Sequence, residues 1–333
     1  TWGGQGLYTI TAATTGKPLT VTHYDALERE VRAGNQRFDG QWQYVDKVYD
    51  NKGRLEKVSL PFRTSPALWN TYAYDTYNRV TGITEASGKI TSWRYNGASV
   101  TETKNGMATT KTQDASGQLI SVTDPGGTIA YMLRPDGQPA SITAPGSVVT
   151  SFAYDDYGRK TSIADPSAGT QTFTESYSGN QKTTTVTDAN GKTVSTVYDQ
   201  YGRATNVNRT EFNTTYAYNA DGQLASEAST NGTNKTYSYD SFGRVTNDVE
   251  NCGVNLQHAY SYSDGNLSSK TTTVNSGNTA TENYSYTNGY LTEIKLNGQT
   301  SIWKLTEENE LGQPTKSQTG QLARTYEYTQ YGM

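Results

Sequence analysis

Aromatic and polar residues alternate in short runs along the chain, and glycine-containing turns separate these runs. In Tyr237-Ser238-Tyr239 the two rings stand at positions i and i+2, so on a β-strand both project from one face. The residues from Asp240 to Arg244 that follow are typical of a turn leading into a return strand. The pattern therefore predicts a β-hairpin.

This motif, Tyr-x-Tyr-Asp-x-x-Gly-Arg, recurs with variation along the chain and therefore decides the architecture. The turn glycines from Gly117 to Gly312 are spaced by 20, 21, 21, 23, 20, 21, 22, 24 and 23 residues. Secondary turns, such as Asn190-Gly191, lie between them. Two turns per period leave two strands of about 5 to 7 residues, which is one hairpin per repeat. The residues that we assign to the structural repeat motif are Tyr49, Asp50, Gly53, Arg54, Tyr74, Asp75, Asn78, Arg79, Tyr154, Asp155, Gly158, Arg159, Tyr198, Asp199, Gly202, Arg203, Tyr218, Gly222, Tyr237, Tyr239, Asp240, Gly243 and Arg244.

Each motif position has a structural explanation. The carboxylate of Asp240 is expected to cap the reversing backbone, and Gly243 to supply a positive φ. Asn78 replaces that glycine in one copy and is the next most tolerant residue. Arg244 is placed to stack on a tyrosine or to pair with a carboxylate. Because one hairpin is marginally stable alone, we expect hairpins to stack and to align their tyrosines into ladders.

The first part of the chain is less regular than the rest. Residues Ala26 to Arg32 have helical propensity, but alignment with the repeat favours a turn followed by a strand. Two prolines between Ser59 and Trp69 indicate an inserted loop. We therefore predict a single repeat array over 1–333, less regular over 1–70 with a loop near 59–70, and regular over 71–333. The chain starts at Thr1 and stops at Met333 within another motif copy, so we expect a fragment of a longer polypeptide.

Composition supports an ordered all-β protein. Leu, Ile, Val and Phe make up only about 15% of the chain, a level otherwise typical of disorder. Disorder also requires high net charge and few aromatic residues, whereas this chain has a net charge of −4, 26 Tyr and 5 Trp.

The absence of a basic run argues against a nucleic-acid partner. No stretch approaches the roughly 20 apolar residues of a membrane span, and no targeting signal is visible.

Candidate catalytic and ligand-binding residues are few. His23 and His258 lie beside tyrosine-rich strand patterns and are interpreted as strand residues. Cys252 is interpreted as a small buried or half-buried residue rather than a nucleophile. Asn190-Gly191-Lys192-Thr193 lacks the upstream glycine of a phosphate-binding loop and is predicted to be a hairpin turn. We therefore predict no catalytic residue, no metal site, no cofactor and no enzymatic activity.

The repeated motif resembles the YD-repeat, or Rhs-repeat, family over nearly the whole chain, from about Tyr24 onward. The resemblance implies a long spiralling β-sheet that forms part of a hollow shell. In bacterial Rhs and insecticidal toxin-complex proteins such a shell encloses a C-terminal toxin, and in teneurins a similar barrel belongs to an adhesion receptor. Members that release cargo contain an Asp-Pro-x-Gly-Leu run. Here Asp124-Pro125 and Asp165-Pro166 have other residues after them, so self-cleavage is not assigned.

The function that the resemblance implies is a non-enzymatic shell segment that encapsulates and protects an associated toxin domain. Its expected partners are the rest of its own polypeptide, namely the shell ends and the C-terminal toxin cargo. Its expected location is secreted or at the bacterial cell surface. The alternative is a cell-surface module for carbohydrate binding or adhesion, whose exposed tyrosines stack on sugar rings or contact another cell.

Overall fold

The computed structural model describes residues 6–332, and in this range the chain is entirely β-structure and turns, without a helix. Every strand pairing recorded in it is antiparallel, and paired strands are neighbours in sequence, for example β4 with β5 and β21 with β22. The predicted all-β class and hairpin repeat are thus confirmed. The expected last motif copy is described as far as Gly332, and Met333 lies outside the described residues.

The chain divides into two compact units, of which the first combines both ends of the sequence: 1–93, 258–273 and 277–333. The unit boundaries fall inside β8 and β24 and at the last residue of β25. The strands with all or part of their length in the first unit are β1 (Tyr8–Ala12), β2 (Thr20–Tyr24), β3 (Glu30–Gln36), β4 (Trp42–Tyr49), β5 (Leu55–Ser59), β6 (Trp69–Tyr74), β7 (Val80–Thr84), β8 (Ile90–Asn96), β24 (Asn255–Ser263), β25 (Asn266–Val274), β26 (Asn278–Thr287), β27 (Tyr290–Leu296), β28 (Thr300–Glu308), β29 (Pro314–Thr319) and β30 (Leu322–Thr325).

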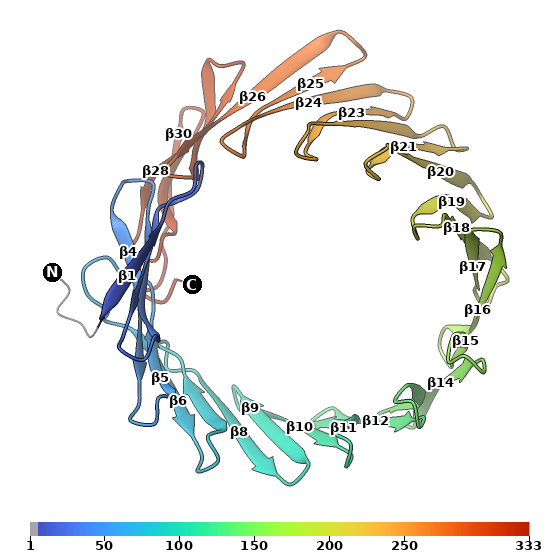
Figure 1. Ribbon diagram of the computed structural model, residues 1–333, viewed down its shortest axis with the longest axis horizontal. Helices are drawn as coiled ribbons and strands as arrows, with labels where there is room; N and C mark the ends of the chain where they lie inside the picture. Colours follow the sequence, from blue (N-terminus) through green and yellow to red (C-terminus); the bar gives the residue numbers. More distant parts are fainter. Residues whose placement is uncertain (1–5, 333) are drawn as a thin grey trace. The chain divides into compact units, whose positions relative to one another are not determined.

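The second unit covers 94–257 and 274–276, and its complete strands form an unbroken antiparallel meander from β9 to β23. Figure 1 shows these strands following one another in chain order, coloured from teal to gold. They are β9 (Ser99–Lys104), β10 (Met107–Gln113), β11 (Leu119–Asp124), β12 (Gly127–Leu133), β13 (Pro139–Ala144), β14 (Val148–Tyr154), β15 (Lys160–Asp165), β16 (Gly169–Ser178), β17 (Gln181–Thr187), β18 (Thr193–Tyr198), β19 (Ala204–Arg209), β20 (Asn213–Tyr218), β21 (Leu224–Ser229), β22 (Asn234–Tyr239) and β23 (Val245–Asn251).

Most of the described strands have the predicted length, but six are longer and one is shorter. β4 has 8 residues, β24, β25 and β28 have 9, and β16 and β26 have 10, whereas β30 has 4. Several of the long strands meet at two-residue turns, such as Asp264-Gly265 and Asn288-Gly289, in which both residues have positive φ. A tight turn of this kind lets the two strands pair as far as the tip of the hairpin. The predicted strand length of about 5 to 7 residues was therefore wrong for these hairpins.

The irregular N-terminal region contains no helix. The residues predicted as turn plus strand form a turn in which Glu28 has φ 58°, followed by β3. The proline-containing segment is a loop between β5 and β6, fastened by a bridge between Phe62 and Tyr44. Phe62 is buried, so this loop contributes to the core of the first unit.

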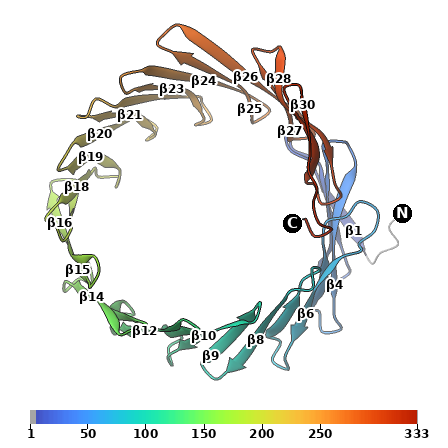
Figure 2. The ribbon, with the colours of Figure 1, turned by 180° about the vertical axis from the view of Figure 1, so that it is seen from behind.

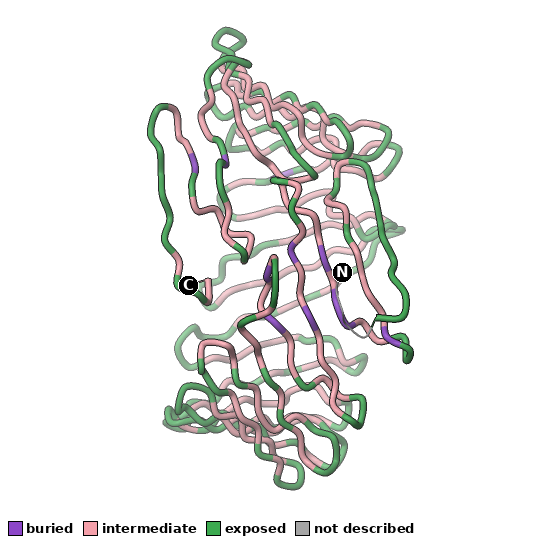
Figure 3. The backbone as a smooth tube through the Cα atoms, turned by 90° about the vertical axis from the view of Figure 1, so that its left-hand side faces the viewer, coloured by how far each residue is buried: buried purple, intermediate pink, exposed green. Residues whose placement is uncertain are grey.

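Buried side chains are rare, and most of those described belong to the first unit (Figure 3). Within residues 6–332, three buried side chains are hydrophobic, namely Val31, Phe62 and Leu305. Arg32 donates two hydrogen bonds to Asp46, at 2.5 and 2.6 Å, and its guanidinium lies 5.2 Å from the centre of the Phe62 ring. The core of this unit is therefore a paired charge surrounded by aromatic rings, because the sequence supplies few aliphatic residues.

Candidate functional site: the repeat turn and the terminal contacts

The repeat turn has one hydrogen-bonding scheme, which the copy at Asp240 illustrates. One carboxylate oxygen of Asp240 accepts the backbone amides of Phe242 and Arg244, at 2.9 and 3.0 Å. The other accepts Arg244 Nε at 2.7 Å, and the ion pair is completed by Nη2 at 2.7 Å. Gly243 has φ 80°, and the ladder shifts register between Ser238 and Tyr239. The motif is thus a turn closed by a bulge, with Asp as its cap.

The same ion pair across four residues recurs in the other full copies. The pairs other than Asp240–Arg244 are Asp25–Arg29, Asp50–Arg54, Asp75–Arg79, Asp155–Arg159 and Asp199–Arg203, with N–O distances of 2.6 to 2.7 Å. Asn78 stands at the glycine position of its copy and has φ 66°. Where the arginine is missing, as at Asn219 and Gln223, an amide pair at 2.8 Å takes the place of the ion pair.

The turn holds its aspartate in the ionised form. Desolvation alone would raise the pKa of Asp240, but hydrogen bonds from the backbone and guanidinium of Arg244 and from the Phe242 amide outweigh it and lower the pKa. The pKa of Asp50 and that of Asp199 are lowered by the same opposing causes. These carboxylates are fully engaged as acceptors, so they are unsuited to act as acids or bases near neutral pH.

Neighbouring repeats are joined through the second tyrosine of the motif. The Tyr239 hydroxyl donates a hydrogen bond to the carbonyl of Leu224, one repeat earlier, at 2.7 Å. Tyr218 does the same to Ala204 at 2.7 Å, and the guanidinium of Arg203 lies 4.5 Å from the centre of the Tyr218 ring. The tyrosine therefore couples two repeats by one hydrogen bond and, where arginine precedes it, by a cation–π contact.

Strands from the two ends of the sequence meet in the first unit. Figures 1 and 2 show the blue N-terminal strands and the red C-terminal strands on the same side of the picture. Arg37, after β3, donates to both carboxylate oxygens of Glu308, at 2.8 to 3.0 Å, and to the carbonyl of Gly312 at 3.1 Å. Its guanidinium also lies 4.2 Å from the centre of the Tyr290 ring. These contacts join residues 271 positions apart and are made by side chains that are 12% and 5% exposed for Arg37 and Glu308.

Amide side chains extend this terminal contact. Gln43 donates to the carbonyl of Glu310 at 2.7 Å, and Asn266 donates to the carbonyl of Gly16 at 2.8 Å. A methyl group on Gly16 would lie 2.0 Å from the carbonyl oxygen of Asp264, so glycine is required by this close approach. The contact is mainly polar and depends on backbone groups as much as on side chains.

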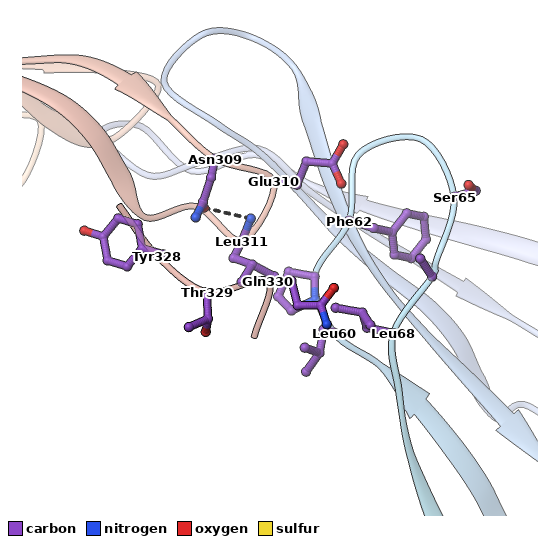
Figure 4. Close-up of a pocket in the computed structure, with 12 residues that line it drawn as sticks. Leu60, Phe62, Ser65, Leu68, Asn309, Glu310, Leu311, Tyr328, Thr329 and Gln330 are labelled. Carbon is purple, nitrogen blue, oxygen red and sulfur yellow. Dashed lines mark hydrogen bonds between the residues drawn. The ribbon is translucent and has the colours of Figure 1, made fainter. Parts of the chain in front are cut away.

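A cavity of about 340 Å³ lies beside the terminal contact (Figure 4). Its walls come from the loop between β5 and β6, including Leu60 and Phe62, and from the C-terminal segment, including Leu311 and Tyr328. The lining contains no histidine or cysteine and only one carboxylate, that of Glu310. No group of three or more His, Cys, Asp or Glu side chains within residues 6–332 is arranged to hold a metal ion.

Residues 135–170 and 218–249 match the family model described as RHS Repeat. These two segments are RHS repeats. The resemblance to the YD-repeat, or Rhs-repeat, family is thereby confirmed in the part of the chain where the turn of Asp155 and that of Asp240 lie. No curated protein matches this chain in sequence.

Among solved structures, this Rhs-repeat chain is similar to two TcdB2-TccC3 structures. The structure with Cdc42 has a TM-score of 0.40 and 13% identity, and the one without the hypervariable C-terminal region has 0.41 and 14%. Each alignment covers 93% of this chain and 23% of the other. A Tc holotoxin pore from Photorhabdus luminescens has a TM-score of 0.31 and 11% identity over 94% of this chain and 29% of that one. The Rhs-repeat chain thus spans less than a third of the length of these structures.

The remaining residues singled out in the sequence are distributed over ordinary structural positions. His23 lies in β2 and His258 in β24, as predicted, and Asn190-Gly191 forms the turn between β17 and β18. Asp165 accepts the amides of the turn that follows it. Cys252 is exposed, so the prediction of a buried or half-buried residue was wrong. It lies in the bend that follows β23.

The terminal contact was not predicted from the sequence. Arg37 and Glu308 belong to no motif copy that singles them out, and nothing local indicates that they meet. The stacking of arginine on tyrosine was one of two options at the motif arginine, and the structure shows both: Arg203 pairs with Asp199 and also covers Tyr218. Between the repeats that contain Arg203 and Tyr218, an arginine–tyrosine contact takes the place of the expected contact between tyrosines.

Proposed function

We propose that this Rhs-repeat chain is a structural segment of a shell that encloses and protects an associated toxin domain. The observation that carries the proposal is the uniform coupling of repeats. The same capped turn and the same tyrosine link recur along the chain, and each repeat adds one hairpin to the last. A wall made in this way has no catalytic centre and grows in area with every repeat.

The terminal contact also fits this proposal. A repeat array that continued without lateral contacts would end in open strand edges, which invite association with other chains. The Arg37–Glu308 pair and the neighbouring amide contacts would fasten early strands to late ones and so bring successive windings of the wall into register. The expected setting is a bacterial protein that is secreted or at the cell surface, with the toxin as cargo.

The proposal is tested on the longest natural polypeptide that contains this sequence. Electron microscopy should show a hollow particle with density inside, and a protease should leave the enclosed density intact while it degrades the same cargo when the cargo is expressed alone. A solid particle, an open rod, or cargo that is degraded equally in both forms would refute containment.

None of the described residues lies in a helix of the length and apolar character needed to cross a membrane.

A further inference from the structure

The cavity of about 340 Å³ between the β5–β6 loop and the C-terminal segment has a mainly apolar lining (Figure 4). Phe62 in this lining is buried, whereas Leu60, Leu68, Leu311 and Tyr328 are half-buried and still reach solvent. The volume lies within the range of small-ligand sites, about 300–1,000 Å³. An apolar group that entered the cavity would remove these side chains from water and would be held by the hydrophobic effect.

The loop that forms one wall of the cavity is fastened at both ends. The Leu60 amide donates a hydrogen bond to the Leu68 carbonyl at 2.9 Å. Phe62 exchanges two backbone hydrogen bonds with Tyr44, at 2.8 and 2.9 Å. The apolar side chains of this wall are therefore held in place by the backbone of the first unit.

The opposite wall is fixed by two consecutive turns. The side-chain oxygen of Asn309 accepts the backbone amides of Leu311 and Gln313, at 2.9 and 3.0 Å. The Gln313 side chain then donates to the carbonyl of Gly332 at 2.8 Å, which ties the following turn to this one. Because both walls are preformed, little ordering of the chain opposes binding.

Glu310 supplies the only charge among the residues that line the cavity. Its side chain is exposed, and its carboxylate forms no hydrogen bond or ion pair with any part of 6–332. The arginines on the adjoining segments are engaged elsewhere, Arg37 with Glu308 and Arg63 with Asp39. The cavity thus combines an apolar lining with one unpaired negative charge.

This combination favours a positively charged ligand. An anion would lose part of its hydration without finding a cation in the lining, and the charge of Glu310 would repel it. A wholly apolar ligand would leave the carboxylate unpaired. A ligand with an apolar body and one positive charge satisfies both features, and the Tyr328 ring is a further group that attracts cations.

We propose that this cavity binds an amphipathic cation, whose apolar body lies beside Leu60 and Leu311 and whose ammonium or guanidinium group pairs with Glu310. The apolar body is withdrawn from water, while the cation stays partly hydrated because Glu310 is exposed. Two sources carry this chemistry, namely a small apolar amine and a polypeptide segment with an apolar residue next to Arg or Lys. The site does not rest on the proposed containment function.

The test is binding of the full chain to three compounds with one apolar body and different charges, measured by calorimetry and by saturation-transfer NMR. They are 3-phenylpropylamine, 3-phenylpropanol and 3-phenylpropanoate. The amine is expected to bind with Kd below about 1 mM, about 3- to 10-fold more tightly than the alcohol, and the carboxylate most weakly. Raising the salt concentration from about 50 mM to about 500 mM should reduce the preference for the amine.

Two variants separate the charge from the apolar lining. Glu310→Gln should lower the affinity for the amine to that for the alcohol and leave the affinity for the alcohol unchanged. Leu311→Ala should weaken the amine and the alcohol alike, about 3- to 10-fold. Glu327→Gln is the matched control, because Glu327 is exposed and carries the same charge but does not line the cavity. Its affinities should equal those of the unchanged chain, and the circular dichroism of all variants should agree.

A peptide distinguishes the two sources of the cation. N-acetyl-Phe-Arg-amide is compared with the same peptide that has citrulline, a neutral analogue, in place of arginine. If the arginine peptide binds more tightly than 3-phenylpropylamine, the site takes a polypeptide segment, and the reverse order assigns it to a small amine.

The proposal is overturned if neither the amine nor the arginine peptide binds at about 10 mM. It is also overturned if the alcohol or the carboxylate binds as tightly as the amine. Equal loss of the preference for the amine in Glu327→Gln and Glu310→Gln would overturn it as well.

Discussion

Replacing Arg37 by alanine should destabilise the first unit strongly. Arg37 donates to both oxygens of Glu308 and to the carbonyl of Gly312, and it also covers the Tyr290 ring. The Glu308 side chain is only 5% exposed, so Arg37→Ala leaves a buried carboxylate without its cation. Removing one partner of a buried ion pair typically costs about 3–5 kcal/mol. Arg37→Lys keeps a charge but loses the bidentate geometry, so an intermediate loss is expected.

The surface pair Lys192–Glu211 supplies the control. Its side chains are 63% and 58% exposed, and such pairs contribute about 0–1 kcal/mol. Lys192→Ala should therefore have little effect. The double variant Arg37→Ala/Glu308→Ala should be less destabilised than the sum of its single variants, because it removes the unpaired charge together with its partner.

Hydrogen exchange is the appropriate assay, because a repeat array need not unfold in one step. Amides of β3 and β28 should lose protection in Arg37→Ala, while those of β19 to β22 keep it. The exchange rates of these amides, measured under native conditions, give the corresponding free energies of opening. A loss below about 1 kcal/mol, or an equal loss for Lys192→Ala, would refute the view that the terminal contact is a major source of stability in this unit.

Three further predictions concern the repeat turn and one half-buried tyrosine. The pKa of the Asp240 carboxyl, like the pKa values of the equivalent turn aspartates, is lowered in the folded chain. Its contribution to stability is therefore present above the unfolded pKa of 3.8 and is lost as the pH falls through the lower folded pKa. The urea concentration at the midpoint of unfolding should decrease over that acidic range, and a midpoint that does not change with pH there would contradict the turn assignment. Gly243→Ala places a side chain at φ 80° and should destabilise the folded chain by about 1–2 kcal/mol. Asn78→Gly, at φ 66°, should leave the stability to thermal unfolding unchanged or slightly increased. Equal losses of stability in the two variants would exclude the conformational explanation. Desolvation and a hydrogen bond to Glu282 raise the pKa of Tyr284 to about 12. Below that pH, ultraviolet titration of the unchanged chain should therefore show as many tyrosinates as that of Tyr284→Phe, although the unchanged chain has one tyrosine more. Glu282→Gln should lower the pKa of Tyr284, and an unchanged titration would disprove the coupling.

The sequence alone predicted what depends on neighbouring residues. Asp, Gly and Arg within five positions define the capped turn, because a carboxylate, a positive φ and a return strand interact over a few bonds. Alternation in Tyr237-Ser238-Tyr239 predicts a face with both rings, and the residues of β22 alternate accordingly between more and less exposed. The class, the hairpin period and the turn at Glu28 followed from this local information.

The lengths of the long hairpins could not be predicted as well from the sequence. Asp264-Gly265 and Gly179 occur at the expected period, but the choice between a bulged turn and a tight two-residue turn depends on how far each ladder continues. That choice is made by cross-strand pairs whose energies are similar in either form. The exposure of Cys252 was missed for a related reason, because the end of β23 is determined by its partner strand.

Only the tertiary structure decided which distant residues meet. Arg37 and Glu308 have no mutual signal in the sequence, since one sequence by itself does not reveal which residues 271 positions apart come into contact. Local chemistry thus specified the repeat, while the contacts that distinguish one repeat from another required the folded chain, because they depend on accumulated register over many strands.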